Sequence, residues 1–233
     1  QPIVEAGSHR IVGMEALARW PNTNGLGKVG PESFIPLAES MGLISDLGRT
    51  VLEKAFRYHA TLKGQGHNLE LSVNISRRQL FSKDLAGTLL KMVQEAGLSP
   101  NEVVLEITES IAMLEVENAT AHLLDLHQAG FRLAIDDFGT GYSTLAQLHE
   151  MPVDEIKIDR AFVQRINTGE GFRILQAITG MASALGLTMV AEGVEDLQSL
   201  GKLESLGVHS IQGFYFSPPV DADQFSLLLK DHS

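Results

Sequence analysis

Two aspartates, Asp136 and Asp137, stand side by side at the end of the apolar run RLAI and directly before the turn FGTG. Two ionised carboxylates repel each other, and burial raises the cost of that repulsion. Water or a cation must therefore reach the pair. The structural alternative is that both aspartates are turn formers ahead of Gly139.

Other polar residues interrupt or end the apolar, β-branched runs of the chain in the same way. They are Glu15 in IVGMEALAR, Asn74 in LELSVN, Glu106 in VVLEIT, Lys157 and Asp159 in EIKID, Glu192 in TMVAE, and Gln212 in SIQG. If the runs are strands of one parallel barrel, their carboxyl ends converge on one face, where active sites form. The shared position favours a common site over several unrelated structural roles.

Each of these residues also has a structural explanation when it is taken alone. The alternatives are a solvated edge residue for Glu15, a helix cap for Asn74, a surface ion pair with Glu155 or Asp159 for Lys157, a helix start for Glu192, and a satisfied core amide for Gln212. These alternatives stay open at the level of the single residue.

The chemistry of the cluster is that of oxygen ligands. The candidate metal ligands are Glu15, Asn74, Glu106, Asp136 and Asp137. Hard cations such as Mg²⁺ and Mn²⁺ prefer such donors, and four carboxylates match the charge of two divalent ions. Neighbouring aspartates face opposite sides of a regular strand, so we expect the strand to fray there and let both turn inward. One of them would then bridge two ions ~4 Å apart, as in phosphoester hydrolysis.

Two further residues complete the predicted chemistry. Lys157 would orient a metal-bound water or stabilise the charge on phosphorus. Glu192 would serve as a base or as an outer residue of the metal site.

The elements that must position these side chains alternate between short strands and longer helices. We expect a hairpin of Gln1–Val4 and Ile11–Ala18, strands at 69–75, 103–108, 132–138, 155–159, 188–193 and 210–216, and helices at 31–42 and 44–63 and between the later strands. About eight strands predict an α/β fold, a modified TIM (β/α)8 barrel with one antiparallel strand from the N-terminal hairpin. The alternative is an open doubly wound sheet, which lacks support because no glycine-rich phosphate fingerprint follows the first strand.

Composition limits the function further. The 233 residues are 44% hydrophobic, contain no cysteine and carry a net charge of −11. One core and one domain over 1–233 are expected, without disulfides or zinc thiolates. No basic cluster supports a polymeric nucleic acid as partner, and no apolar run approaches the ~20 residues of a membrane span. Because the chain opens on QPIV without a methionine, we expect a domain excised from a longer multidomain protein.

The sequence resembles the EAL domain family, the cyclic-di-GMP phosphodiesterases. The matching stretches, in the order of the family, are QPIV, EALARW, FIPLAE, VNIS, LEITES, DDFGTGYSTL, PVDEIKID, VAEGVE and QGFYFS. They cover nearly the whole chain. Together they are highly specific, whereas Glu15-Ala16-Leu17 alone would mean little.

The resemblance implies hydrolysis of one phosphodiester bond of cyclic di-GMP to linear pGpG with two Mg²⁺ or Mn²⁺ ions, and Ca²⁺ is expected to inhibit. Carried over motif by motif, the five oxygen-donor residues are the metal ligands, with Glu15 catalytic as well. Lys157 would hold the catalytic water, and Glu192 would act as base or outer ligand.

The resemblance also implies substrate and partner contacts. Arg19 would meet a substrate phosphate, and the dinucleotide would lie along Gln1, Leu17, Gln212 and Asp159. Glu109 would support the loop DDFGTGYSTL through its backbone N–H groups or through Ser143 and Thr144, and that loop would couple metal binding to a homodimer contact. Sensory or GGDEF-type domains are expected in the parent chain, with this domain in the cytoplasm and membrane anchoring of the parent left open.

Two positions depart from the family pattern. Ala18 replaces the second leucine of EALLR, and Pro218 replaces the basic residue of the last motif. Neither position is a metal ligand. A receptor that binds cyclic di-GMP without cutting it, and a scaffold that acts through its dimer surface, are the alternatives. The complete set of ligands and the intact loop motif favour the hydrolase.

Overall fold

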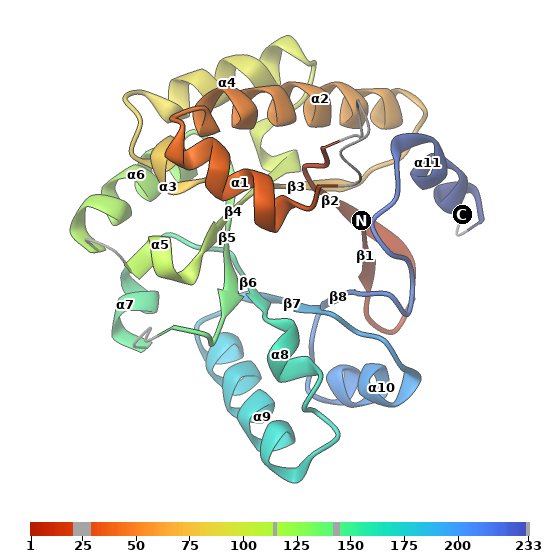
Figure 1. The fold of residues 1–233 in the computed structure, drawn as a ribbon. Coiled ribbons are helices and arrows are strands. Elements are labelled where there is room, and N and C mark those ends of the chain that lie inside the picture. Colours follow the sequence, from red (N-terminus) through yellow and green to blue (C-terminus); the bar gives the residue numbers. More distant parts are fainter. Residues whose placement is uncertain (21–28, 114–115, 142–144, 232–233) are drawn as a thin grey trace.

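A computed structural model describes residues 1–20, 29–113, 116–141 and 145–231. Its strands close into one barrel in the order of the sequence, from β1 to β8. The strands are β1 Pro2–Glu5, β2 Ile11–Ala16, β3 Glu70–Asn74, β4 Val103–Thr108, β5 Arg132–Phe138, β6 Glu155–Ile158, β7 Thr188–Glu192 and β8 Ser210–Gln212. Figure 1 shows the helices around this barrel, so the predicted modified TIM barrel is confirmed.

The antiparallel strand is β1. It pairs antiparallel with β2, as the predicted hairpin requires, and also with β8, where the barrel closes. The other neighbouring strands pair in parallel. One antiparallel strand therefore makes two antiparallel pairs, whereas the hairpin alone predicts one.

The last strand is shorter than the sequence predicts. The run SIQGFYF was expected to be extended over 210–216, but β8 ends at Gln212. Gly213 lies so close to the backbone of Val194 that a Cβ atom would collide with it. The chain then turns, and the N–H groups of Phe216 and Ser217 donate to the carbonyl of Gly213. Close backbone packing at Gly213 thus ends the strand.

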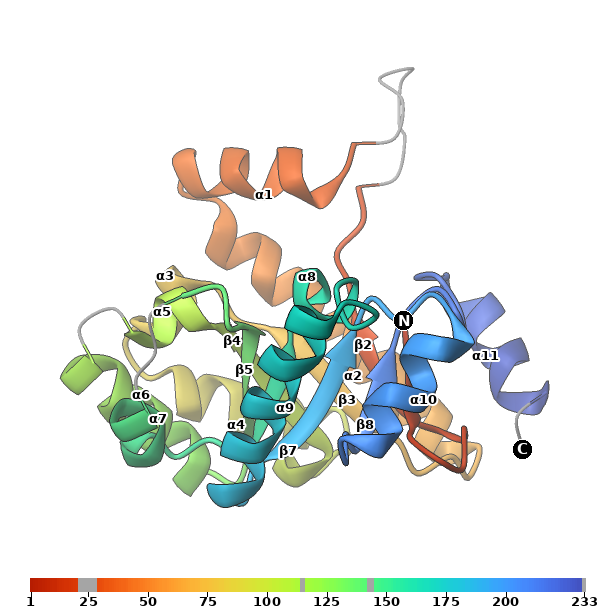
Figure 2. The same ribbon diagram turned by 90° about the horizontal axis from the view of Figure 1, so that it is seen from below.

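Most of the long helices surround the barrel wall, and three short ones lie beside the carboxyl ends of the strands. The helices are α1 Pro31–Ser40, α2 Ile44–Gly64, α3 Arg77–Leu80, α4 Leu85–Glu95, α5 Glu109–Met113, α6 Val116–Gln128, α7 Leu145–Glu150, α8 Arg160–Val163, α9 Gly169–Ala184, α10 Leu197–Ser205 and α11 Ala222–Asp231, with a 3-10 turn η1 at Pro100–Glu102. The sequence predicts one helix after each of the strands β3, β4 and β6. In the structure two helices follow each of these strands, and the first of each two is short: α3 before α4, α5 before α6, and α8 before α9. Figure 2 shows these short helices at one end of the barrel, with α1 standing beyond them. No helix among the described residues is both long and apolar enough to cross a lipid bilayer.

Alternation along the strands explains why apolar runs carry polar residues. On β4, Leu105 and Ile107 are fully buried in the cluster that also contains Leu123 and Leu126 of α6. Glu106 lies between them in sequence and must face the other side, the barrel interior. The outer face of β4 thus packs against α6, and Glu106 occupies the inner face toward the carboxyl end of the strand.

A separate polar cluster fills the opposite, N-terminal end of the barrel. The first residues of β3, β5, β6 and β7 form it, namely Glu70, Arg132, Glu155 and Thr188. Arg132 forms ion pairs with Glu70 and, at 3.5 Å, with Glu155. Thr188 donates a hydrogen bond to Glu155 at 3.1 Å. Burial raises the pKa of Glu155 in spite of the nearby arginine. Arg132 therefore compensates a carboxylate that the fold has largely removed from water.

We expect Arg132→Met to lower the free energy of unfolding by roughly 2–4 kcal/mol, because it leaves Glu155 buried without its cation. Urea unfolding at pH 7 measures this loss. Arg165→Met is the matched control, since Arg165 pairs with Glu170 on the surface, with side chains 55% and 68% exposed. Equal losses in the two variants would contradict a structural role for the Arg132 cluster.

Candidate active site

The ammonium group of Lys157 lies at the centre of the carboxyl-end cluster. Its Nζ atom is surrounded by Glu192 at 2.7 Å, Glu106 at 2.9 Å, Glu15 at 3.4 Å and Asp136 at 3.5 Å. The Lys157 side chain is 1% exposed. The surface ion pair with Glu155 or Asp159, which the sequence left open, is therefore wrong. One cation faces carboxylates from β2, β4, β5 and β7.

The surrounding carboxylates hold this ammonium in its charged form. Burial by itself lowers the pKa of Lys157, but Glu106, Glu15, Glu192 and Asp136 outweigh it and hold the pKa well above its usual value. Nζ also lies at hydrogen-bond distance from Glu192 and Glu106, at 2.7 and 2.9 Å, and Lys157 acts as a charged donor to both. The other buried oxygen of Glu106, Oε2, has no aligned donor among the described residues, which suits a cation ligand better than a structural hydrogen bond.

Glu15 is the most firmly held carboxylate of the cluster. Its two oxygens accept hydrogen bonds from Asn74 Nδ2 at 2.8 Å and Gln212 Nε2 at 2.7 Å. Burial raises its pKa, but Lys157 and these two donors overcome burial and lower the pKa to about 2. Glu15 is 7% exposed, so the edge-residue alternative is wrong. It remains ionised throughout the physiological range.

The two amide donors to Glu15 differ in how they compare with the structural roles considered for them: the helix cap is wrong for Asn74, whereas Gln212 is a buried amide as that alternative described. Asn74 does not cap the next helix, because Ser76 is the N-cap of α3 and forms a capping box with Gln79. Gln212 is 4% exposed and donates to Gln1 Oε1 at 3.0 Å as well as to Glu15. The Gln1 amide in turn donates to the carbonyl of Ser217 at 2.9 Å. A chain of amides thus joins β8 to Glu15.

A β-bulge brings the two aspartates to the same side of β5. Ile135 pairs with Ile156, and Phe138 pairs with Ile158, so Asp136 and Asp137 together stand opposite the single residue Lys157. Asp137 has a left-handed backbone with φ of 55°, and its N–H donates to Asp136 Oδ1 at 2.9 Å. The expected fraying is wrong, since β5 continues to Phe138. The bulge cancels the alternation of the strand.

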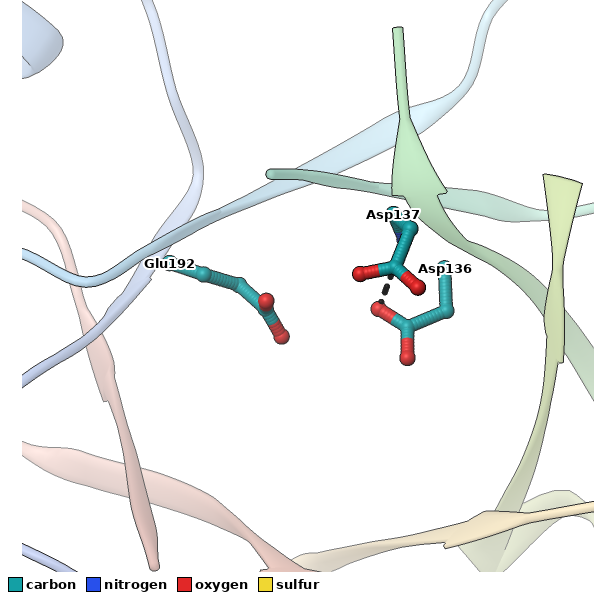
Figure 3. A group of neighbouring side chains, drawn as sticks. All are labelled: Asp136, Asp137 and Glu192. Carbon is teal, nitrogen blue, oxygen red and sulfur yellow. Dashed lines mark hydrogen bonds between the residues drawn. The ribbon is translucent and has the colours of Figure 1, made fainter. Parts of the chain in front are cut away.

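Asp136, Asp137 and Glu192 form a group that could hold a metal ion. One oxygen from each lies within 4.8 Å of the others, and Figure 3 shows the three side chains pointing into the same space from β5 and β7. Glu192, predicted as a base or outer residue, thus lies close enough to be a ligand. The all-oxygen donor set fits Mg²⁺ or Mn²⁺.

Several of these carboxyl groups bind protons more tightly than usual. Burial, opposed by Lys157 and reinforced by Asp136, raises the pKa of Glu192 to about 7. Burial and Glu15 raise the pKa of Glu106 well above its ordinary value. Burial and Asp136 also raise the pKa of Asp137. The single ammonium group of Lys157 therefore does not neutralise the cluster. A metal cation that displaced the protons from these carboxyl groups would neutralise it.

The loop after β5 is held by Glu109, the first residue of α5. Glu109 is 1% exposed, and its Oε2 accepts hydrogen bonds from the N–H groups of Gly139 at 2.9 Å and Gly141 at 3.0 Å. The expected acceptance of loop N–H groups is confirmed. Ser143 and Thr144, the other expected donors, lie outside the described residues.

The remaining predicted residues lie around this centre. Leu17 is half-buried after β2, and Arg19 is exposed and donates to the carbonyl of Ala18 at 2.9 Å. Asp159 caps α8 by accepting from the N–H of Ala161 at 2.9 Å. Sequence reasoning missed Phe162, which packs against the loop glycine Gly139. The sequence carries no signal of that contact.

Comparison with known proteins agrees with this fold. The model of the EAL domain matches residues 1–219. The oxygen sensor protein DosP of Escherichia coli K12 is 38% identical over 226 residues, which are 96% of this chain and 28% of DosP. The bifunctional diguanylate cyclase/cyclic di-GMP phosphodiesterase MucR of Pseudomonas aeruginosa is 37% identical over 226 residues, 96% of this chain and 33% of MucR.

A solved structure has the same fold as this chain. The PaMucR phosphodiesterase in its c-di-GMP complex superposes with a TM-score of 0.92 at 36% identity, covering 97% of this chain and 92% of that one. Fold and site define an α/β barrel with an acidic cluster at its carboxyl end. The chain belongs to the EAL domain family. It spans about a third of the length of the curated relatives named above.

The pKa of Glu192 predicts a pH-dependent effect of Glu192→Gln on stability without metal. In the unfolded chain this carboxyl has its ordinary pKa of 4.5, against about 7 in the fold. Between these values the folded state keeps a proton that the unfolded state loses, so the free energy of unfolding falls as pH rises. Glu192→Gln removes that cost, so it should stabilise the chain by roughly 1–3 kcal/mol at pH 8.

The same substitution should have little effect at pH 4.5, where Glu192 is protonated in the fold. Urea unfolding in excess chelator at the two pH values measures the difference. An equal effect at both values, or destabilisation at pH 8, would contradict the raised pKa.

Proposed function

We propose that this chain is a metal-dependent hydrolase that cleaves one phosphodiester bond of cyclic di-GMP and releases linear pGpG. The observation that carries the proposal is the buried ammonium of Lys157 among four carboxylates, from Glu15, Glu106, Asp136 and Glu192. Such an acidic centre calls for further cations, and cations at a barrel mouth suit phosphoester chemistry. Membership in a family that includes the phosphodiesterase MucR supports the choice of substrate.

The metal-holding residues in this proposal are the oxygen donors of the cluster. They are Glu15, Asn74, Glu106, Asp136 and Asp137, with Glu192 as base or further ligand. Asn74 gives its amide hydrogen to Glu15, which leaves its carbonyl oxygen as the ligand atom. Two ions of Mg²⁺ or Mn²⁺, when bound, would polarise the phosphate and activate the attacking water.

The protein groups supply the proton transfers and the orientation. Hydrolysis joins a water oxygen to phosphorus and breaks the bond to the 3′ oxygen, which ends with a proton. Glu192 lies beside Lys157 and the two aspartates, so it is placed to take a proton from the water. Lys157 stays protonated, so it can orient the water and stabilise charge on the phosphoryl oxygens.

Substrate contacts extend from this centre toward the rim. We assign Arg19 to a phosphate, because its guanidinium is exposed just beyond the strand that carries Glu15. Leu17, Gln1, Gln212 and Asp159 lie along the dinucleotide in this proposal. Gln212 has a second task, since its amide also fixes Glu15. Asp159 also caps α8, so this residue can influence the site through that helix.

The wider assignments follow from family membership. Glu109 accepts hydrogen bonds from the loop after β5, and in this proposal that loop links metal binding to a homodimer contact. Sensory or GGDEF-type domains in the parent protein would control this domain, which we place in the cytoplasm. MucR, a bifunctional cyclase and phosphodiesterase, illustrates such a combination.

The direct test is incubation of the pure chain with cyclic di-GMP and chromatography of the products. We expect pGpG with Mg²⁺ or Mn²⁺ and none in excess chelator. Ca²⁺ should suppress the reaction, because it occupies oxygen sites without the tight geometry that activates water. Full hydrolysis in chelator would contradict metal dependence. Binding of cyclic di-GMP without hydrolysis in either metal would favour the receptor.

A substitution separates chemistry from folding. Glu15→Gln keeps the shape of the side chain but removes its charge, so kcat should fall by at least ~100-fold. Glutamine is preferable to alanine, since it fills the buried space and its amide oxygen can keep one of the two hydrogen bonds that Glu15 accepts. Glu5→Gln is the control, because Glu5 ends β1 and lies at the surface. A thermal unfolding scan accompanies the assay. Unchanged kcat in Glu15→Gln would remove Glu15 from the mechanism.

A further inference from the structure

The short helix α8 lies beside the metal-binding group without contributing a ligand to it. It begins directly after β6, the strand of Lys157, and Asp159 caps it. Val163 anchors it, fully buried in the cluster that contains Ile158 and Val194. Figure 2 places α8 at the same end of the barrel as α3 and α5. A fixed element therefore stands next to the loops that follow β5 and β7.

Both loops pack against α8 through a glycine. A Cβ atom at Gly139, two residues after Asp137, would lie 2.7 Å from Cε2 and 2.9 Å from Cζ of Phe162. A Cβ atom at Gly193, directly after Glu192, would lie 2.5 Å from Cβ of Arg160. One helix thus contacts the backbone next to each strand end that carries the Asp136, Asp137 and Glu192 group.

The backbone at Asp137–Gly139 needs such support. Asp137 has φ of 55° and Gly139 has φ of 100°, so two of three consecutive residues lie on the left-handed side. That conformation costs free energy at Asp137, which carries a side chain. On one side, Glu109 accepts the N–H groups of Gly139 and Gly141. Glu109 fixes the direction of these N–H groups, and on another side the ring of Phe162 limits movement of the Gly139 backbone toward α8.

We propose that Phe162 is a positioning residue of the active site: its ring holds Gly139, and with it the Asp136–Asp137 bulge, in the geometry that binds metal. This inference rests on the proposed function, since it assumes that Asp136 and Asp137 are metal ligands. Outer groups that orient ligands commonly change metal affinity or activity by 10–100-fold. Phe162 would orient the ligands through the packing of its ring against Gly139, because its side chain has no polar atom that could form a hydrogen bond.

The test is Mn²⁺ titration of the intact chain without substrate, followed by electron paramagnetic resonance of the free ion. Phe162→Leu keeps an apolar anchor but removes Cε2 and Cζ, the atoms nearest Gly139. We expect it to weaken Mn²⁺ binding about 10-fold or more with little change in melting temperature. Phe162→Met, whose side chain reaches about as far, should restore binding to within about 3-fold of wild type.

Phe172→Ala is the matched control, because Phe172 is also partly buried against the same apolar cluster but belongs to α9. It should lower the melting temperature and leave Mn²⁺ affinity unchanged. Wild-type affinity in Phe162→Leu, or equal weakening in Phe172→Ala, would overturn the proposal. If wild type binds Mn²⁺ but does not hydrolyse cyclic di-GMP, the proposed function fails while this titration still decides the role of Phe162. If wild type binds no Mn²⁺, both fail, and the failure appears before any variant is compared.

Discussion

The arrangement on which the rest of the structure depends is the buried ion cluster around Lys157. A single ammonium group lies within 3.5 Å of carboxylates from four different strands. Removing so many charges from water is costly unless they are compensated, and one positive charge leaves the cluster acidic. Burial, reinforced by the neighbouring carboxylates, raises the pKa values of Glu106 and Glu192. Glu15 is also buried, but Lys157 and the amide donors overcome that burial and lower its pKa. A site of this kind is suited to bind cations.

The barrel supplies the geometry that such a cluster requires. Parallel register sets Asn74 beside Glu106, and the bulge in β5 turns both aspartates toward the same space. The opposite end of the barrel is closed by the Arg132 cluster. Glu109 and α8 then fix the loop backbone from two sides. The left-handed conformation of Asp137 is thereby maintained next to the ligands, where strained backbone commonly serves function.

Much of this could be predicted from the sequence, because the repeated apolar runs with a polar residue near the end survive as strands with inward-facing side chains. Glu106 and Lys157 are examples: each interrupts an apolar run, and each is buried inside the barrel. The bulge at Asp136–Asp137 could not be predicted, because it depends on the register with β6. The early end of β8 depends on backbone packing between Gly213 and Val194, and the role of Phe162 depends on its contact with Gly139. These are contacts between segments distant in sequence, which no local pattern encodes.

The most direct test of the central claim, that cations complete the acidic cluster, is anomalous diffraction at the manganese edge from crystals grown with Mn²⁺. The account predicts two anomalous peaks ~4 Å apart, close to the carboxylates of Asp136 and Asp137. Crystals that diffract well but show no anomalous peak between β4, β5 and β7 would contradict it, because Lys157 and bound protons would then be the only compensation of the buried carboxylates.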